Sequence, residues 1–159
     1  MKKTDPAISM LLASLDEAFD HKAWHGANLR GSLRGLTAQQ AARRPAPGRH
    51  NIWEIAVHAA YWKYAVRRTI TDEKRGSFPL RGSNWFPREE PDAIAWRRDL
   101  ELLGAEHRQL RAVVAALPAA RLNQLSAKKV YTIGGLIRGI AAHDLYHGGQ
   151  IQLLKRLVL

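Results

Sequence analysis

The sequence contains no cysteine, and no uninterrupted apolar segment approaches the ~18 residues that a membrane span needs. The lack of cysteine excludes disulfides, thiolate metal sites and a cysteine nucleophile. The N-terminal segment, MKKTDPAISMLLASLDEAFD, lacks the apolar core and the small-residue cleavage site of a signal peptide. We therefore expect a cytoplasmic protein with no membrane segment.

Acidic residues are scarce: 14 Asp and Glu stand against 25 Lys and Arg, which gives a formal net charge of +11. This excess would permit binding of polyanions or of acidic small molecules. No DNA-reading motif is present, however, and the basic pairs fall in different segments. We therefore expect these pairs to lie on solvated helix faces and loops and not to form a nucleic-acid surface. They are Arg43/Arg44, Arg67/Arg68, Lys74/Arg75, Arg97/Arg98, Lys128/Lys129 and Lys155/Arg156.

Hydrophobic periodicity predicts an all-α chain. With 159 residues, 46% of them hydrophobic, the chain is long enough for one domain with a real core, spanning residues 1–159. Four amphipathic helices are expected, and no convincing set of strands is present. A four-helix bundle is the simplest way to bury their apolar stripes. The expected helices cover residues 5–35, 51–72, 92–117 and 132–157, with a short helical turn at 37–42.

The predicted helix starts carry recognisable capping residues. Asp5 precedes Pro6, which is favoured at the first helical position. Asn51 is a good N-cap, with Glu54 three residues later as a capping-box partner. Thr132 can cap the last helix. The loop 73–91 contains Trp85 and is expected to fold back over the body, although its position relative to any site is open.

The C-terminal segment HDLYHGGQIQLLKR places His143 and His147 four residues apart on the apolar stripe of the last helix. Side chains at this spacing lie ~6 Å apart on one face. Two such imidazoles can converge on one metal ion at ~2.1 Å. His58 lies on the apolar stripe of the second predicted helix and should also point inward.

Three inward histidines create a burial problem, because buried polar nitrogens without partners are costly. No set of buried carboxylates is evident from the sequence, so a shared cation would solve the problem. Imidazole ligands suit Zn, Ni, Cu or Fe. The alternative is that His143 and His147 are simply a packing or surface pair.

Other polar residues near these stripes have several interpretations. His25 continues the apolar stripe of the first predicted helix and could be a fourth ligand, a general base, or a buried histidine bonded to a carbonyl. Gln150 could accept a hydrogen bond from a ligand or be exposed. His21, His50 and His107 are interpreted as structural or solvated.

Three segments resemble the DinB/YfiT-like superfamily of metalloenzymes: AWHGANL (23–29), LTAQQAARRPAPGRHNIWEIAVHAAYW (36–62) and YTIGGLIRGIAAHDLYHGGQIQLLKR (131–156). The specific part is H-x-x-x-H-x-G-Q, formed by His143, His147, Gly149 and Gln150. The resemblance implies a bundle that binds a divalent metal, zinc or nickel, through His58, His143 and His147. Three protein ligands leave one position open, as in reactive rather than structural sites.

The resemblance also implies a range of functions. Characterised members include thiol-dependent S-transferases, so we expect a metal-dependent thiol transferase or hydrolase that takes a small-molecule substrate and a low-molecular-weight thiol. Related proteins are often dimeric, which implies a homodimer. The alternatives are a non-catalytic stress-response or binding module, and a metal that serves only as a structural staple.

Overall fold

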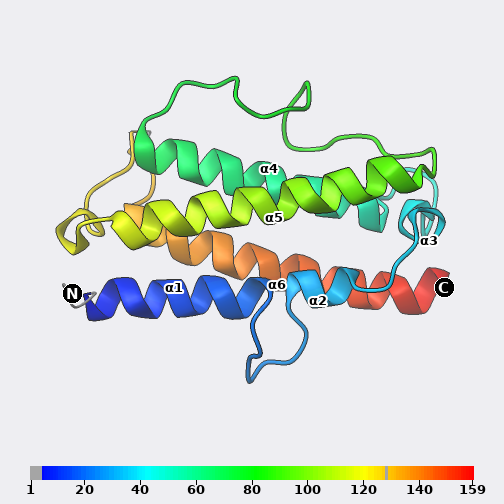
Figure 1. Ribbon diagram of the computed structural model, residues 1–159, viewed down its shortest axis with the longest axis horizontal. Helices are drawn as coiled ribbons and strands as arrows, with labels where there is room; N and C mark the ends of the chain where they lie inside the picture. Colours follow the sequence, from blue (N-terminus) through cyan, green and yellow to red (C-terminus); the bar gives the residue numbers. More distant parts are fainter. Residues whose placement is uncertain (1–4, 128) are drawn as a thin grey trace.

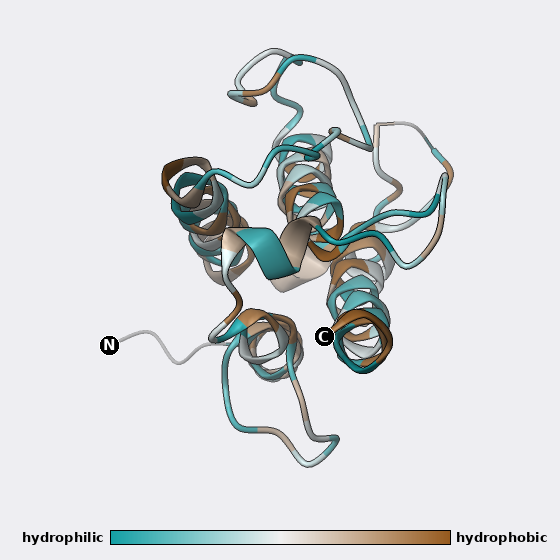
Figure 2. Cartoon of the chain, turned by 90° about the vertical axis from the view of Figure 1, so that its right-hand side faces the viewer, coloured by the Kyte–Doolittle hydropathy of each residue, from teal (hydrophilic) through white to brown (hydrophobic). Residues whose placement is uncertain are grey.

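The computed structural model describes residues 5–127 and 129–159. Four long helices form a bundle, seen from the side in Figure 1 and end-on in Figure 2: α1 (Pro6–Phe19), α4 (Ile52–Thr71), α5 (Ala93–Ala116) and α6 (Ile133–Val158). The short helices α2 (Leu29–Leu33), α3 (Ala38–Ala42) and η1 (Ala119–Arg121) lie in the connections. The all-α prediction is confirmed, and the described residues contain no strand, only an isolated bridge between Leu125 and Thr132.

The predicted helix starts are confirmed by their hydrogen bonds. The Asp5, Asn51 and Thr132 side chains accept from backbone N–H groups in the first turns of α1, α4 and α6. Each bond satisfies a donor that the helix itself leaves unpaired. Glu54 is not the capping-box partner predicted for Asn51, because its carboxylate binds Arg44 and His50 instead.

The first predicted helix is wrong beyond Phe19. The chain leaves α1 there, forms a loop over residues 20–28, and begins again as α2. Gly26 has a φ of 101°, which a helix cannot accommodate, and the Asn28 side chain caps α2 by accepting from the Gly31 N–H. The sequence pattern misleads because Ala18 and Leu29, both buried, keep the same helical phase across the break.

The core consists of two apolar clusters with charged residues between them. One cluster includes Trp53 and Leu103, and the other includes Leu15 and Ile137. At the level where α4 and α6 pass from one cluster to the other, Lys63 is fully buried and forms an ion pair with Asp144. The core therefore contains buried carboxylates, but among the described residues none of them forms a hydrogen bond or ion pair with His58, His143 or His147, as the sequence led us to expect. The buried or nearly buried acidic residues are Asp16, Glu54, Asp99, Glu106 and Asp144.

None of the helices in the described part of the chain is both long and apolar enough to cross a membrane. Lys128, a member of one of the basic pairs, lies outside the described residues, as do residues 1–4 of the N-terminal segment.

Candidate metal centre

Three histidines meet between α4 and α6. The Nε2 atom of His143 lies 3.1 Å from Nε2 of His58 and 3.1 Å from Nε2 of His147. The ligand atoms that these three residues offer all lie within 4.8 Å of one another. The structure thus brings together the three histidines that the sequence singled out, although His58 and His143 are 85 residues apart in the chain. That they bind a metal stays a prediction.

The opposite ring nitrogens of two of these histidines are anchored. His58 Nδ1 lies 2.8 Å from the backbone oxygen of Asn84, and His147 Nδ1 lies 2.7 Å from Oε1 of Gln150. Both partners are acceptors, since the Gln150 amide nitrogen donates to the Tyr146 hydroxyl at 3.0 Å. The two Nδ1 atoms therefore carry the proton, and both Nε2 atoms present a lone pair to His143.

His143 cannot satisfy this arrangement by itself. In its neutral form the ring carries one proton, which cannot form linear hydrogen bonds to two neighbours at once. Its Nδ1 atom is buried and has no hydrogen-bond partner among the described residues. Three Nε2 atoms therefore face one another, and two of them present lone pairs that one N–H of His143 cannot satisfy together. A shared cation would satisfy all three.

Burial keeps these imidazoles neutral. It lowers the pKa of His58 to about 4, and the nearby His147 and His50 add to the effect against the opposing bond to Asn84. Burial also lowers the pKa of His143 to about 3, and it moves the pKa of His147 in the same direction. Metal binding requires the neutral ring, so the three side chains are in the competent form near pH 7.

Residues 84 and 85 of the loop 73–91 form one wall of the centre. The Trp85 ring stacks between His58 and His50, with centroid distances of 3.8 and 3.6 Å. Asn84 has a φ of 66°, a left-handed conformation that asparagine tolerates, and its side chain accepts from Nε1 of Trp62 at 2.9 Å. The loop therefore folds back over the body, as expected, and fixes the orientation of His58.

A cavity of about 750 Å³ opens beside the histidines. Such a volume suits a small organic molecule, for which sites usually measure roughly 300–1,000 Å³. Arg49 and His50 contribute polar groups to its lining. Most of the remaining wall is apolar or aromatic and comes from Pro45, Ile55, Trp62, Trp85, Tyr146, Leu153 and Leu154.

A buried carboxylate holds the segment that carries Arg49 and His50. The Glu54 carboxylate lies 2.9 Å from Nδ1 of His50 and accepts two hydrogen bonds from the Arg44 guanidinium. Burial alone would raise the pKa of Glu54, but these bonds keep it below the usual range. The interpretation of His50 as structural or solvated missed its place in the cavity wall. The prediction that Arg44 belongs to a solvated helix face is wrong, because its guanidinium binds the buried Glu54.

His25 is not part of the centre. It is exposed in the loop between α1 and α2, so its predicted position on a core stripe and its role as a buried histidine are wrong. It is not in the group of histidines that could hold a metal, and it does not line the cavity beside them. His21, also exposed, pairs with Asp20. His107 is buried and stacks on Phe19 at 3.8 Å, in agreement with its structural interpretation.

The buried ion pair beside the centre was missed in the sequence, although a signal existed. Lys63 interrupts the apolar stripe of α4 formed by Ile52, Ala56, Ala59, Val66 and Ile70. Asp144 interrupts the corresponding stripe of α6. Two opposite charges in the middle of two apolar stripes indicate a buried pair, because either charge alone would be too costly to bury.

The fold and the site together define an all-α bundle with a three-histidine centre between two of its helices. A family model described as the DinB superfamily matches residues 21–151. The chain belongs to the DinB superfamily, a metal-binding superfamily, which confirms the resemblance seen in the motif around His143 and His147. No curated protein and no solved structure matches the chain.

Proposed function

We propose that this protein is a metal-dependent enzyme whose centre is His58, His143 and His147. The observation that carries the proposal is the convergence of three Nε2 atoms while Asn84 and Gln150 hold the opposite nitrogens of two of the rings. A divalent ion held there, zinc or nickel, would act as a Lewis acid and lower the pKa of a water molecule or thiol at its open position.

The residues around the centre are suited to a small substrate. Trp62 and Trp85 give the cavity an aromatic wall, and the Arg49 guanidinium can bind a carboxylate. His50 donates from Nδ1 to the Glu54 carboxylate, while its Nε2 has no hydrogen bond among the described residues. That nitrogen is available to exchange a proton with a substrate. These features support transfer of a low-molecular-weight thiol to a small molecule, or hydrolysis.

Metal content tests the first step of this proposal. Protein purified without a histidine tag should contain close to one equivalent of zinc or nickel, and His147→Ala should lose it. His25→Ala, which changes an exposed histidine outside the cluster, is the matched control and should keep the metal. Absence of metal from the wild type, with none taken up on titration, would refute the proposed centre and favour a non-catalytic binding module.

Thiol binding tests the second step. Cobalt-loaded protein titrated with 2-mercaptoethanol should change its visible absorption spectrum, whereas ethylene glycol, its oxygen analogue, should not change it. An unchanged spectrum with the thiol would refute thiol transfer and leave hydrolysis as the proposed reaction.

We propose a homodimer as the assembly, supported by Leu153 and Leu157, which lie exposed on α6. Sedimentation velocity should give a mass of twice 17.9 kDa. A monomer at all concentrations would contradict this. A cytoplasmic location stays a prediction from the sequence.

A further inference from the structure

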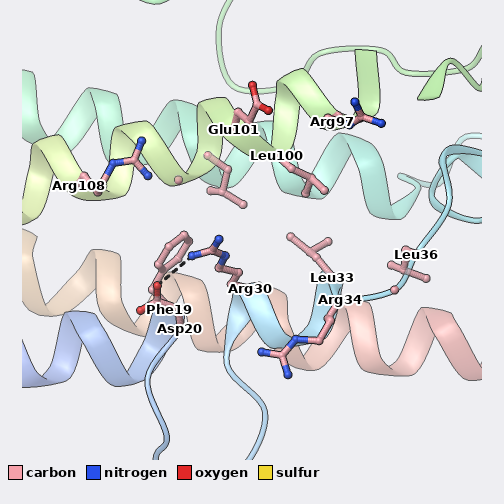
Figure 3. A pocket seen from close by; sticks show the side chains of 13 residues that line it. Phe19, Asp20, Arg30, Leu33, Arg34, Leu36, Arg97, Leu100, Glu101 and Arg108 are labelled. Carbon is pink, nitrogen blue, oxygen red and sulfur yellow. Dashed lines mark hydrogen bonds and ion pairs between the residues drawn. The ribbon is translucent and has the colours of Figure 1, made fainter. Parts of the chain in front are cut away.

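A second cavity lies between α5 and the α1–α2 side of the bundle (Figure 3). Its volume is about 560 Å³, and it shares no lining residue with the histidine cavity. It exists because the chain breaks after Phe19. The short helix α2 then packs against α6, where a side chain at Gly148 would meet the backbone of Asn28 and Leu29, and it makes few contacts with α5.

Five of the residues that line this cavity are apolar. Leu33 of α2 and Leu100 of α5 face each other across it in Figure 3, and Phe19 lies toward one end. Leu36 and Leu103 complete the apolar lining. A cavity of this volume provides room for a hydrocarbon or aromatic body.

Four arginines also line the cavity: Arg30, Arg34, Arg97 and Arg108. Two carboxylates, Asp20 and Glu101, also line the cavity, so it carries an excess of two positive charges. Arg30 is bonded to Asp20 at 3.3 Å. Within the described residues, Arg34, Arg97 and Arg108 form no ion pair or side-chain hydrogen bond. These guanidiniums therefore keep their capacity for an external anion.

Gly104 gives Arg108 its position over the cavity. Gly104 is buried within α5, and a Cβ atom added there would lie 3.3 Å from Nη1 of Arg108. The Arg108 guanidinium therefore lies against α5, over the position where Gly104 has no side chain. In Figure 3 Arg108 and Arg30 come from opposite walls toward the end of the cavity occupied by Phe19.

We propose that this cavity is a second ligand site, which binds an organic carboxylate with an apolar body. The carboxylate lies between Arg108 and Arg30, which donate hydrogen bonds to it, and the apolar body lies between Leu33 and Leu100. Such a ligand matches two features of the cavity: its excess of positive charge, with Arg108 free of ion pairs among the described residues, and the half-buried Leu36 and Leu100 in its lining. The site is independent of the histidine centre.

Isothermal titration calorimetry with decanoate tests this proposal. Wild-type protein should bind one equivalent of decanoate, and Arg30→Gln/Arg108→Gln should weaken binding at least tenfold. Arg138→Gln/Arg156→Gln, which removes the same charge from exposed positions on α6, is the matched control and should bind as the wild type does. All four arginines are exposed, so both variants should unfold at the wild-type temperature.

The two parts of the ligand are tested separately. Acetate carries the charge without the chain and 1-decanol carries the chain without the charge, so each should bind at least tenfold more weakly than decanoate. Leu100→Trp should fill the cavity and abolish decanoate binding, while His147→Ala should leave it unchanged. Equal binding of decanol and decanoate, equal loss in both arginine pairs, or binding that disappears in His147→Ala would overturn the proposal.

Discussion

The cavity beside the three histidines and the one lined by Arg30 and Arg108, here called the histidine cavity and the arginine cavity, hold their polar groups in opposite ways. In the histidine cavity the three imidazoles are neutral, and Asn84 and Gln150 fix the rings of His58 and His147. In the arginine cavity the guanidiniums are exposed, charged and mostly without partners. The first arrangement suits a resident ion, because its geometry is set before binding. The second suits an exchangeable anion, because little has to be broken when the ligand enters.

The largest expected effect concerns the ion pair beside the histidine cavity. Asp144→Ala leaves the Lys63 ammonium buried without its partner, and should lower the free energy of unfolding by about 3–5 kcal/mol. Lys63→Met/Asp144→Leu removes both charges and should recover most of this loss. Urea unfolding measures both variants. A loss below about 1 kcal/mol for Asp144→Ala would mean that the Lys63 ammonium reaches water. The regions around the two cavities would then not differ in how deeply they bury charge.

Acidification should also separate the two regions. In the unfolded chain, His58 and His143 take up a proton below the ordinary histidine pKa of about 6.5. In the folded protein their pKa values are about 4 and about 3, so they take up the proton only at a lower pH. The unfolded chain therefore binds more protons over that range, and stability falls as the pH decreases from about 6.5 to 4. Each such histidine contributes a slope of ~1.4 kcal/mol per pH unit.

Urea unfolding in the presence of a chelator, at intervals from pH 7.5 to 4.5, measures this slope. His143→Gln should reduce it by the contribution of one histidine, whereas His21→Gln, a change of an exposed side chain, should leave it as in the wild type. A slope that is the same in all three proteins would contradict the assignment of neutral, buried rings to the centre.

A smaller effect is expected at the residue that anchors His147. Gln150→Ala removes the acceptor of the Nδ1 proton and should weaken metal binding about 10- to 100-fold. Gln150→Glu keeps an acceptor oxygen and should restore most of the affinity. Competition with a chromophoric chelator measures both. Equal affinities in the wild type and Gln150→Ala would show that the anchored nitrogen has no part in binding.

The smallest effect is expected in the arginine cavity. Arg97→Gln removes an exposed guanidinium without an ion pair among the described residues, and should change the free energy of unfolding by less than about 0.5 kcal/mol. The same urea experiment as for Asp144→Ala gives a direct comparison. A loss as large as that of Asp144→Ala would show that Arg97 has a structural partner and is not available to a ligand.

The two cavities also differ in how far the sequence predicts them. His58, His143 and His147 lie on apolar stripes of long, well-capped helices, and helical spacing alone points them inward. Trp85 and Asn84 could not be placed, because a loop carries no periodicity. The arginine cavity was invisible because it depends on the break after Phe19, where the apolar phase continues through residues that form a loop.

The polar interior was also underestimated. Lys63 and Asp144 occupy stripe positions that the pattern assigns to apolar residues, and only their opposite charges indicate that they meet. Glu54 was assigned to a helix cap from its spacing to Asn51, but the tertiary contact with Arg44 prevails. In both cases a long-range partner decides the role of the side chain, and such partners cannot be identified from one element alone.

Anomalous diffraction at the zinc edge, from crystals of the protein grown with zinc, tests the central claim most directly. One strong peak should lie between α4 and α6, within ~2.0–2.1 Å of the Nε2 atoms of His58, His143 and His147. A fourth position should be filled by a non-protein ligand. A fully coordinated ion with a fourth protein ligand would contradict the open centre, and a peak elsewhere, or none, would contradict the centre itself.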